Sequence, residues 1–244
     1  MLLGMFFVLF GSTLHAAEKP DIAEIRKAAE VGDAWSQGEL GLKFATGDKV
    51  LQNFQQAFFW SQKGAEQGDS TAQNTLGYLF EYGQGVPQDY AQAVTWYKKA
   101  AGQGFAIAQF NLGLKYAHGD GVAQDAKEAL LWFKKAAEQG LAAAQFNLGQ
   151  MYGKGEGGRQ KNENAYAWLS LAAAQGEAGA AINRDMIAKE LSSEQRRGAQ
   201  DLIAQLQAEI DKQMKQTSPS PQFIANQKEL SSWLQSIKPA AGGK

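Results

Sequence analysis

Cysteine is absent from the 244-residue chain, which excludes disulfide bonds, thiol nucleophiles, thiolate metal ligands and a lipid-modified cysteine. Histidine occurs only as His15 and His118. Two imidazoles far apart in the chain do not form a catalytic cluster or a histidine-rich metal site. The sequence therefore gives no indication of a metal ion or of any other cofactor.

Proline and an excess charge of one sign are also lacking. Of the five prolines, only Pro87 lies between residues 21 and 218, so almost all of that stretch can be helical. The 24 Lys and Arg residues are balanced by 25 Asp and Glu residues, for a net charge of -1. This balance disfavours nucleic acid as a partner, because nucleic-acid binders carry a basic excess or a basic patch.

Residues 1–17 are interpreted as an export signal that is removed. Apolar residues run from Leu2 to Phe10 and are followed by Ala16 and Ala17, an arrangement typical of a signal-peptide core and its cleavage region. The run is shorter than the ~20 apolar residues that span a bilayer, and no Lys or Arg precedes it. We therefore expect a periplasmic or secreted protein that is not inserted in the membrane. The alternative is an N-terminal helix that stays attached, as an anchor or packed on the domain.

A 36-residue repeat organises residues 34–177. Tryptophan recurs at this interval, as do Leu-Gly and Gln-Gly pairs, without any insertion or deletion. The tryptophans are Trp60, Trp96, Trp132 and Trp168; the Leu-Gly pairs begin at Leu40, Leu76, Leu112 and Leu148; the Gln-Gly pairs begin at Gln67, Gln103, Gln139 and Gln175. These coincident series define four units, 34–69, 70–105, 106–141 and 142–177.

Each unit is predicted to form a hairpin of two helices. In the second unit Ala72, Leu76 and Phe80 recur every four residues and form one apolar stripe. Asp89 with Gln92 three residues later is a capping-box start for the second helix. Because one hairpin cannot bury its apolar face alone, neighbouring hairpins stack. The predicted fold class is therefore an all-α, right-handed α/α solenoid.

The repeated tryptophans are expected to lie in the core and not to serve as surface platforms for sugars. Truncation of Trp96 or Trp132 to Ala is expected to cost about 3–5 kcal/mol, the usual range for a core aromatic residue. Truncation of Trp60 or Trp168 to Ala is expected to cost less, because the outer units can relax.

The flanking segments are expected to close the stack. Residues 21–33 match the second helix of a unit, and residues 18–33 would form a half-repeat cap. Residues 178–217 would form C-terminal capping helices, with Ser192 and Gln195 capping the longer one. Residues 218–244 are interpreted as a linker and a short amphipathic tail. The apolar positions of that tail, which can share one helix face, are Phe223, Leu230, Trp233, Leu234 and Ile237.

The four units resemble the Sel-like repeat, a 36-residue relative of the tetratricopeptide repeat. The shared pattern is A/S-x-A/S-Q-x-x-L-G-x-x-F/Y, then G-x-G-V, an Asp, and A-x-x-W-x-x-K-A-A-x-Q-G, and it is clearest in residues 70–105 and 106–141. The resemblance implies an α/α solenoid that acts as an adaptor in protein assembly or signalling. Many bacterial proteins of this kind are exported.

The outer units depart from the pattern at three loop and cap positions. Lys49 replaces a loop glycine, Gly158 replaces the loop valine, and Lys161 replaces the acidic residue that caps the second helix. If the loop glycines have positive φ, Lys49 carries a penalty on the order of 1 kcal/mol. We expect frayed loops in these two units and the same fold.

A candidate partner-binding groove lies on the first helices, at positions that vary between units. With Leu76 pointing inward and 100° per residue, these positions point away from the core, yet they carry many apolar side chains. The candidate residues are Trp35, Leu42, Tyr78, Tyr82, Phe110, Leu114, Phe146 and Gln150. They would line the concave face and bind an extended or helical peptide. The alternative is that tight winding buries several of them against the next unit.

Two functions from different classes remain. The leading hypothesis is a non-enzymatic adaptor of the bacterial cell envelope that binds an unidentified protein or peptide in the groove. The alternative is an envelope enzyme, such as a cell-wall or β-lactam hydrolase, although no Ser-x-x-Lys motif occurs. Residues 222–237 could also dock in the groove and compete with the partner, since they are tethered to it.

Overall fold

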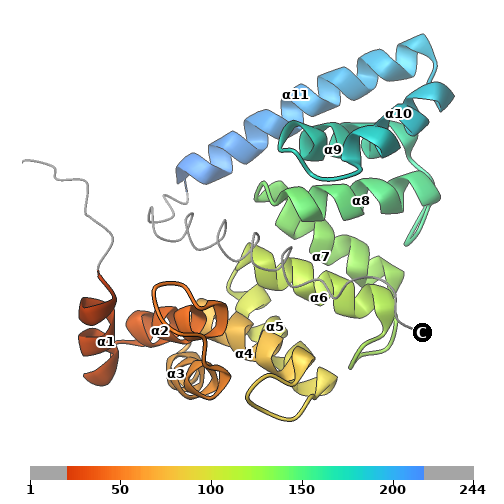
Figure 1. Ribbon diagram of the computed structural model, residues 1–244. Coiled ribbons are helices and arrows are strands. Elements are labelled where there is room, and N and C mark those ends of the chain that lie inside the picture. Colours follow the sequence, from red (N-terminus) through yellow and green to blue (C-terminus); the bar gives the residue numbers. More distant parts are fainter. Residues whose placement is uncertain (1–20, 217–244) are drawn as a thin grey trace, which may run out of the picture.

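The computed structural model describes residues 21–216, and within that range the chain forms eleven α-helices and no strand. The helices follow one another in a continuous stack from α1 to α11 (Figure 1). Their bounds are α1 Ile22–Glu30, α2 Ala34–Thr46, α3 Phe54–Glu66, α4 Ser70–Tyr82, α5 Tyr90–Gly102, α6 Ala106–His118, α7 Ala126–Glu138, α8 Ala142–Lys154, α9 Asn162–Ala174, α10 Ala180–Glu190 and α11 Ser193–Gln216. The predicted all-α solenoid is confirmed.

Each unit is a hairpin, α2 with α3, α4 with α5, α6 with α7 and α8 with α9, and each hairpin packs on the next. The repeated leucines Leu40, Leu76, Leu112 and Leu148 are fully buried. They belong to three apolar clusters that follow one another along the stack. Burial of this leucine series is what one isolated hairpin could not achieve.

Glutamines join each unit to the one before it. Gln73 of α4 donates from Nε2 to the carbonyl of Ala65 at 3.3 Å, and accepts at Oε1 from Gln103 Nε2 at 2.8 Å. Gln103 donates also to the Gly68 carbonyl at 2.9 Å. The first two contacts recur around Gln37, Gln109 and Gln145. A buried amide left without partners costs about 1–3 kcal/mol, so this joint stabilises the register of the stack.

The N-caps of the second helices agree with the capping residues expected from the sequence. Asn53, Asp89 and Asp125 accept from the backbone amide three residues on, which starts α3, α5 and α7. Lys161 makes no side-chain cap bond to α9, in accord with its departure from the pattern. Lys49 has φ 58°, the left-handed conformation that glycine takes at the same position of the other three units.

The prediction for the tryptophans is wrong in part. Trp60 and Trp168 are buried, at 7% and 2% exposed, whereas Trp96 and Trp132 are half-buried. In the two central units the next residue, Tyr97 or Phe133, takes the deeper position and is almost fully buried. The Trp96 and Trp132 rings lie nearer the surface, each under a lysine three residues on, Lys99 at 3.8 Å and Lys135 at 4.1 Å.

The two ends of the stack are built differently. At the N-terminal end, Ala29 of α1 and Gly32 of the turn after it supply their carbonyls to the first glutamine joint, so α1 occupies the place of a second helix. At the C-terminal end, Ser192 and Gln195 form the expected reciprocal cap of α11. The predicted export signal, residues 1–17, and the predicted tail, residues 218–244, lie outside the described residues.

Within residues 21–216, no helix combines the length and the apolar character needed to cross a membrane.

Candidate interaction surface

The predicted contact residues all lie on the first helices of the four units. They are Trp35 and Leu42 on α2, Tyr78 and Tyr82 on α4, Phe110 and Leu114 on α6, and Phe146 and Gln150 on α8. Their exposure is uneven: the buried members lie in the first two units, and those of the last two units are half-buried. Two of the eight are fully buried, five are half-buried, and Tyr82 is exposed.

The prediction that Leu42 and Tyr78 are accessible contact residues is wrong, because their side chains are only 3% and 1% exposed. Leu42 packs into the cluster that contains Tyr97 and Ile107. The reason is a close approach of α2 to α4 at Gly38, where a Cβ atom would lie 3.3 Å from the Ala72 Cβ. Tight winding, the alternative considered from the sequence, therefore holds for the first two units.

Later units keep part of this surface open. The position occupied by Gly38 in the first unit carries Phe110 in the third and Phe146 in the fourth. Both rings are half-buried: Phe110 packs on Phe133 with ring centroids 5.7 Å apart, and Phe146 borders the turn at Gly179. Bulky side chains at this position replace the close helix contact that glycine permits. We call Tyr82, Phe110, Leu114, Phe146 and Gln150 the first-helix face.

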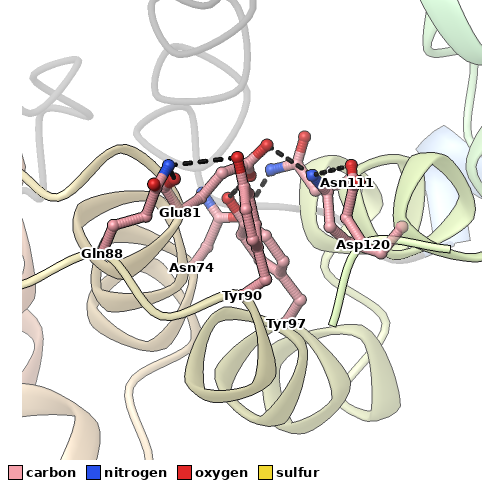
Figure 2. A network of polar contacts seen from close by, with 8 residues as sticks. Asn74, Glu81, Gln88, Tyr90, Tyr97, Asn111 and Asp120 are labelled. Carbon is pink, nitrogen blue, oxygen red and sulfur yellow. Dashed lines mark hydrogen bonds and ion pairs between the residues drawn. The ribbon is translucent and has the colours of Figure 1, made fainter. Parts of the chain in front are cut away.

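A polar network lies at the base of this face, between the second and third units (Figure 2). Glu81 at the end of α4 accepts from the Tyr97 hydroxyl at 2.7 Å and from Lys115 Nζ at 2.6 Å. Lys115 donates also to Asp120 at 3.1 Å. One carboxylate thereby ties α4 to α5 and, through Lys115, to α6 and its following loop.

Two further contacts extend the network on either side. Gln88 donates to the Tyr90 hydroxyl at 3.1 Å and to the Glu81 carbonyl at 2.8 Å. Asn111 of α6 donates to Asn74 of α4 at 3.1 Å, and both side chains are buried (Figure 2). The first helices of these two units are therefore joined by hydrogen bonds, where the first two units are joined by a glycine contact.

Burial and neighbouring charges shift the pKa values of Lys115, Tyr82 and Tyr97. Burial lowers the pKa of Lys115, but Glu81 and Asp120 raise it by more, so the pKa lies above its ordinary value. Burial and the neighbouring Glu81 raise the pKa of Tyr82 to about 12, and the same two causes raise the pKa of Tyr97 above its ordinary value. Lys115 is therefore a protonated, fully engaged cation and not a nucleophile or a general base. The network is a rigid support for the Tyr82 edge of the first-helix face.

Sequence reasoning missed the central pair of this network. Lys115 occupies a position that carries Lys43 in the first unit, Leu79 in the second and Met151 in the fourth. A lysine at a position that is apolar in two units was the available signal, because a buried lysine requires a buried or nearby carboxylate. Its partner Glu81 replaces Ala45 and Ala117.

A second feature missed from the sequence is a hollow of 420 Å³ between the second helices α3 and α5. Phe58, Phe80 and Trp96 line it together with Gln62 and Gln92. In the next unit Tyr116 and Lys98 stand at the positions of Phe80 and Gln62, with Lys98 5.6 Å from the centre of the Tyr116 ring. None of the residues that line the hollow belongs to the first-helix face.

Among residues 21–216, no group of three or more Asp, Glu or His side chains is placed to hold a metal ion. His118 is exposed at the end of α6. The chemistry offered by the surface is apolar contact and hydrogen bonding.

The stacked hairpins and their glutamine joints define a helical-repeat solenoid of the tetratricopeptide type. Residues 36–69, 70–105, 106–141 and 142–177 match the family model of the Sel1 repeat. The chain belongs to the Sel1 repeat family, whose members generally mediate protein–protein interactions. No curated protein sequence matches the chain.

Two solved structures illustrate the similarity. The c5321 protein, a protective antigen present in uropathogenic Escherichia coli strains with an SLR fold, is 34% identical over 91% of this chain, with a TM-score of 0.72. A Sel1 repeat protein from Oxalobacter formigenes is 38% identical over 66% of this chain, with a TM-score of 0.60. The matched regions cover only 44% and 47% of those two chains.

Proposed function

We propose that this protein is a non-enzymatic adaptor of the bacterial cell envelope, and that its first-helix face binds a segment of a partner protein. The observation that carries the proposal is the persistence of partly exposed Tyr82, Phe110, Leu114 and Phe146 on three consecutive units. The repeat does not require these residues, since they vary from unit to unit. Partly exposed aromatic residues on a rigid frame supply large contact area at a small loss of side-chain entropy.

The frame beneath the face supports this proposal. Glu81, Lys115 and the Asn74–Asn111 pair fix α4 against α6 before any partner arrives. A surface that is already ordered avoids the ordering cost that otherwise weakens binding. An extended or helical segment running along α4, α6 and α8 would meet one apolar side chain or pair per unit.

Site-specific photocrosslinking tests the face in its native cell. A photoreactive residue at Tyr82 is expected to capture a partner, whereas one at Leu131 is not. Leu131 is the matched control because its exposed fraction, 42%, is close to that of Tyr82, 41%, and it lies on the second helix α7. Equal capture of the same protein at both positions would reject the first-helix face.

A binding measurement with the captured partner then tests the anchors. The Phe110→Ser, Phe146→Ser double variant is expected to weaken binding at least about 30-fold, the effect of losing ~2 kcal/mol of anchor contacts. Its urea midpoint is measured alongside, because both rings are half-buried. A well-folded double variant with unchanged affinity would contradict the proposal. Deleting residues 218–244 in a parallel sample shows whether that segment competes for the same surface.

The envelope location is proposed from the apolar run Leu2–Phe10 and the alanines that follow. The description of the c5321 protein as a protective antigen is consistent with a location accessible to antibodies in that relative. Intact-mass analysis of protein from a native envelope fraction is expected to show loss of residues 1–17. A mass that includes Met1, in a cytoplasmic fraction, would contradict both the cleavage and the location.

The hydrolase alternative is tested directly by incubating the purified chain with peptidoglycan and with a chromogenic β-lactam. The adaptor proposal expects no turnover. Turnover that survives further purification and is lost on a His118→Ala substitution would favour the enzyme.

A further inference from the structure

Helix α10 carries two large apolar side chains that are exposed to solvent. Ile182 is 67% exposed and Met186 is 60% exposed. They are four residues apart, so they lie on the same face of the helix, one turn from each other. Exposed neighbours of this size on one face mark a place where something packs.

The same two positions are less exposed in each of the four complete units. One repeat earlier they are Phe146 and Gln150, both half-buried, and two repeats before that they are Asn74 and Tyr78, both fully buried. Phe146 borders Gly179 in the turn that leads into α10. The face of Ile182 and Met186 is thus the one on which a following first helix would pack.

The described part of the chain does not provide that cover. The Leu-Gly pair that faces the second helix in each complete unit is replaced in α10 by Arg184 and Asp185, which form an ion pair at 2.7 Å. Helix α11 accordingly leaves α10 and packs along α9, reaching α7, where Ile210 meets the Gly140 turn. The layer of second helices is closed by α11, whereas the layer of first helices ends at α10.

We propose that residues 222–237 of this same chain pack on Ile182 and Met186 and close the layer of first helices. Their apolar positions can form one face of a helix, with Leu230, Trp233 and Leu234 at its centre. The segment follows α11 directly in the chain. A tether of this length gives an effective concentration on the order of mM, which favours it over any free competitor.

The connection is long enough. The 24 residues of α11 and the 11 residues of α10 span about 36 Å and 16 Å, so α11 extends about 20 Å further than α10. The chain from Gln216 to Gln222, with residues 217–221 as the spacer between them, can cover about 20 Å when extended. Because Ile182 lies in the first turn of α10, at the end toward which α11 runs, the spacer returns the segment to the level of the apolar pair.

The cysteine-free sequence permits a direct test. The full chain with Met186→Cys is labelled with bimane, a fluorophore that tryptophan quenches on contact. We expect quenching that is lost on Trp233→Phe. The same label on Leu51→Cys, at a position 90% exposed at the other end of the stack, is the matched control and is expected to be unaffected by Trp233→Phe.

Each other outcome overturns the proposal. Equal fluorescence with and without Trp233 means that the segment does not reach α10. Quenching that depends on protein concentration identifies a second copy of the chain as the occupant. Quenching of a bimane on Tyr82→Cys, in place of Met186→Cys, puts the segment on the first-helix face.

A label-free measurement guards against disturbance by the fluorophore. Trypsin has one cleavable site within residues 217–238, at Lys228, because Lys238 precedes Pro239. The Ile182→Ser, Met186→Ser variant is expected to speed cleavage at Lys228 relative to the natural chain, and Leu51→Ser is expected to leave it unchanged. Both variants alter exposed side chains, so the fold is retained. Equal cleavage rates in all three chains would also overturn the proposal.

Discussion

At the scale of the residue, the Tyr97 ring can pack closely on α4 because residue 77 is a glycine. A Cβ atom on Gly77 would stand 2.5 Å from Tyr97 Cε1, and that ring is fully buried with its hydroxyl held by Glu81. We expect Gly77→Ala to lower the free energy of unfolding by about 1–3 kcal/mol, the usual cost of overpacking. Urea denaturation of the purified chain measures it.

Gly102 supplies the control for that substitution. It ends α5, and a Cβ there would meet no atom within 4 Å. Gly102→Ala is expected to be neutral or to stabilise by up to about 1 kcal/mol, since alanine is the better helix former. Equal losses in the two variants would show that close packing at Gly77 is not the cause.

Asp69 gives the stability of the protein a pH dependence. Its carboxylate caps α4 through the Ala72 amide at 2.7 Å. Burial raises the pKa of Asp69, the Ala72 amide lowers it, and the charges of Glu39 and Asp33 raise it, for a value of about 6 against 3.8. The folded state therefore binds this proton more tightly than the unfolded state. Its contribution to stability is present below pH 3.8 and is lost as the pH rises through about 6.

The Asp69→Asn variant isolates this effect, because Asn keeps the cap but has no proton to lose. The stability of the variant relative to the natural chain is expected to increase between pH 4 and pH 7, by on the order of 2 kcal/mol. Urea midpoints at several pH values give this difference. A difference that is constant over the range would contradict burial as the cause.

At the scale of the element, the start of α9 lacks a cap that its counterparts possess. Asp89 and Asp125 cap α5 and α7, whereas Lys161 forms no such bond and adds a positive charge to the positive end of α9. Lys161→Asp is expected to stabilise the protein by about 1 kcal/mol. Thermal unfolding measures the gain. Lys161→Ala removes the charge without adding the cap, and a gain as large as that of Asp would show that capping is not responsible.

The sequence predicted where the helices begin better than it predicted which side chains pack between the helices. Asn53, Asp89 and Asp125 located the starts of second helices because capping is a contact between residues three apart. Burial of Trp96 was overestimated because it depends on whether Tyr97 takes the deeper place, which is a contact between helices. Leu42 was misjudged for the same reason, since the close approach at Gly38 involves two separate units.

At the scale of the whole molecule, stability is expected to be lowest at the C-terminal end of the stack. In a solenoid each unit is held only by its neighbours. Only Ala180 of α10 is buried, whereas α4 and α6 are buried along most of their length. Hydrogen exchange of the backbone amides should therefore be faster in α10 than in α4 or α6. Equal protection of the amides in α4, α6 and α10 would contradict the view that each unit is stabilised only by contacts with its neighbours.

The 36-residue register specified the architecture of the molecule, since a period of this length has few solutions other than stacked hairpins. The candidate surface was predicted less completely. Tyr82, Phe110, Leu114, Phe146 and Gln150 keep exposed area, but the Glu81–Lys115 pair beneath them was not foreseen. A repeat pattern describes what the units share, and Glu81 occurs in one unit only, since the other three carry Ala45, Ala117 and Gly153 at its position.

The glutamine joint makes the length of this protein adjustable. Removing residues 106–141 would connect Phe105 directly to Ala142, and Gln145 would then meet the carbonyl of Ala101 in the way that Gln109 does now. Duplicating the same segment would add a unit without creating a new kind of contact. Gene-level gain or loss of one unit thus changes the reach of the molecule in a single step while every remaining joint keeps its partners.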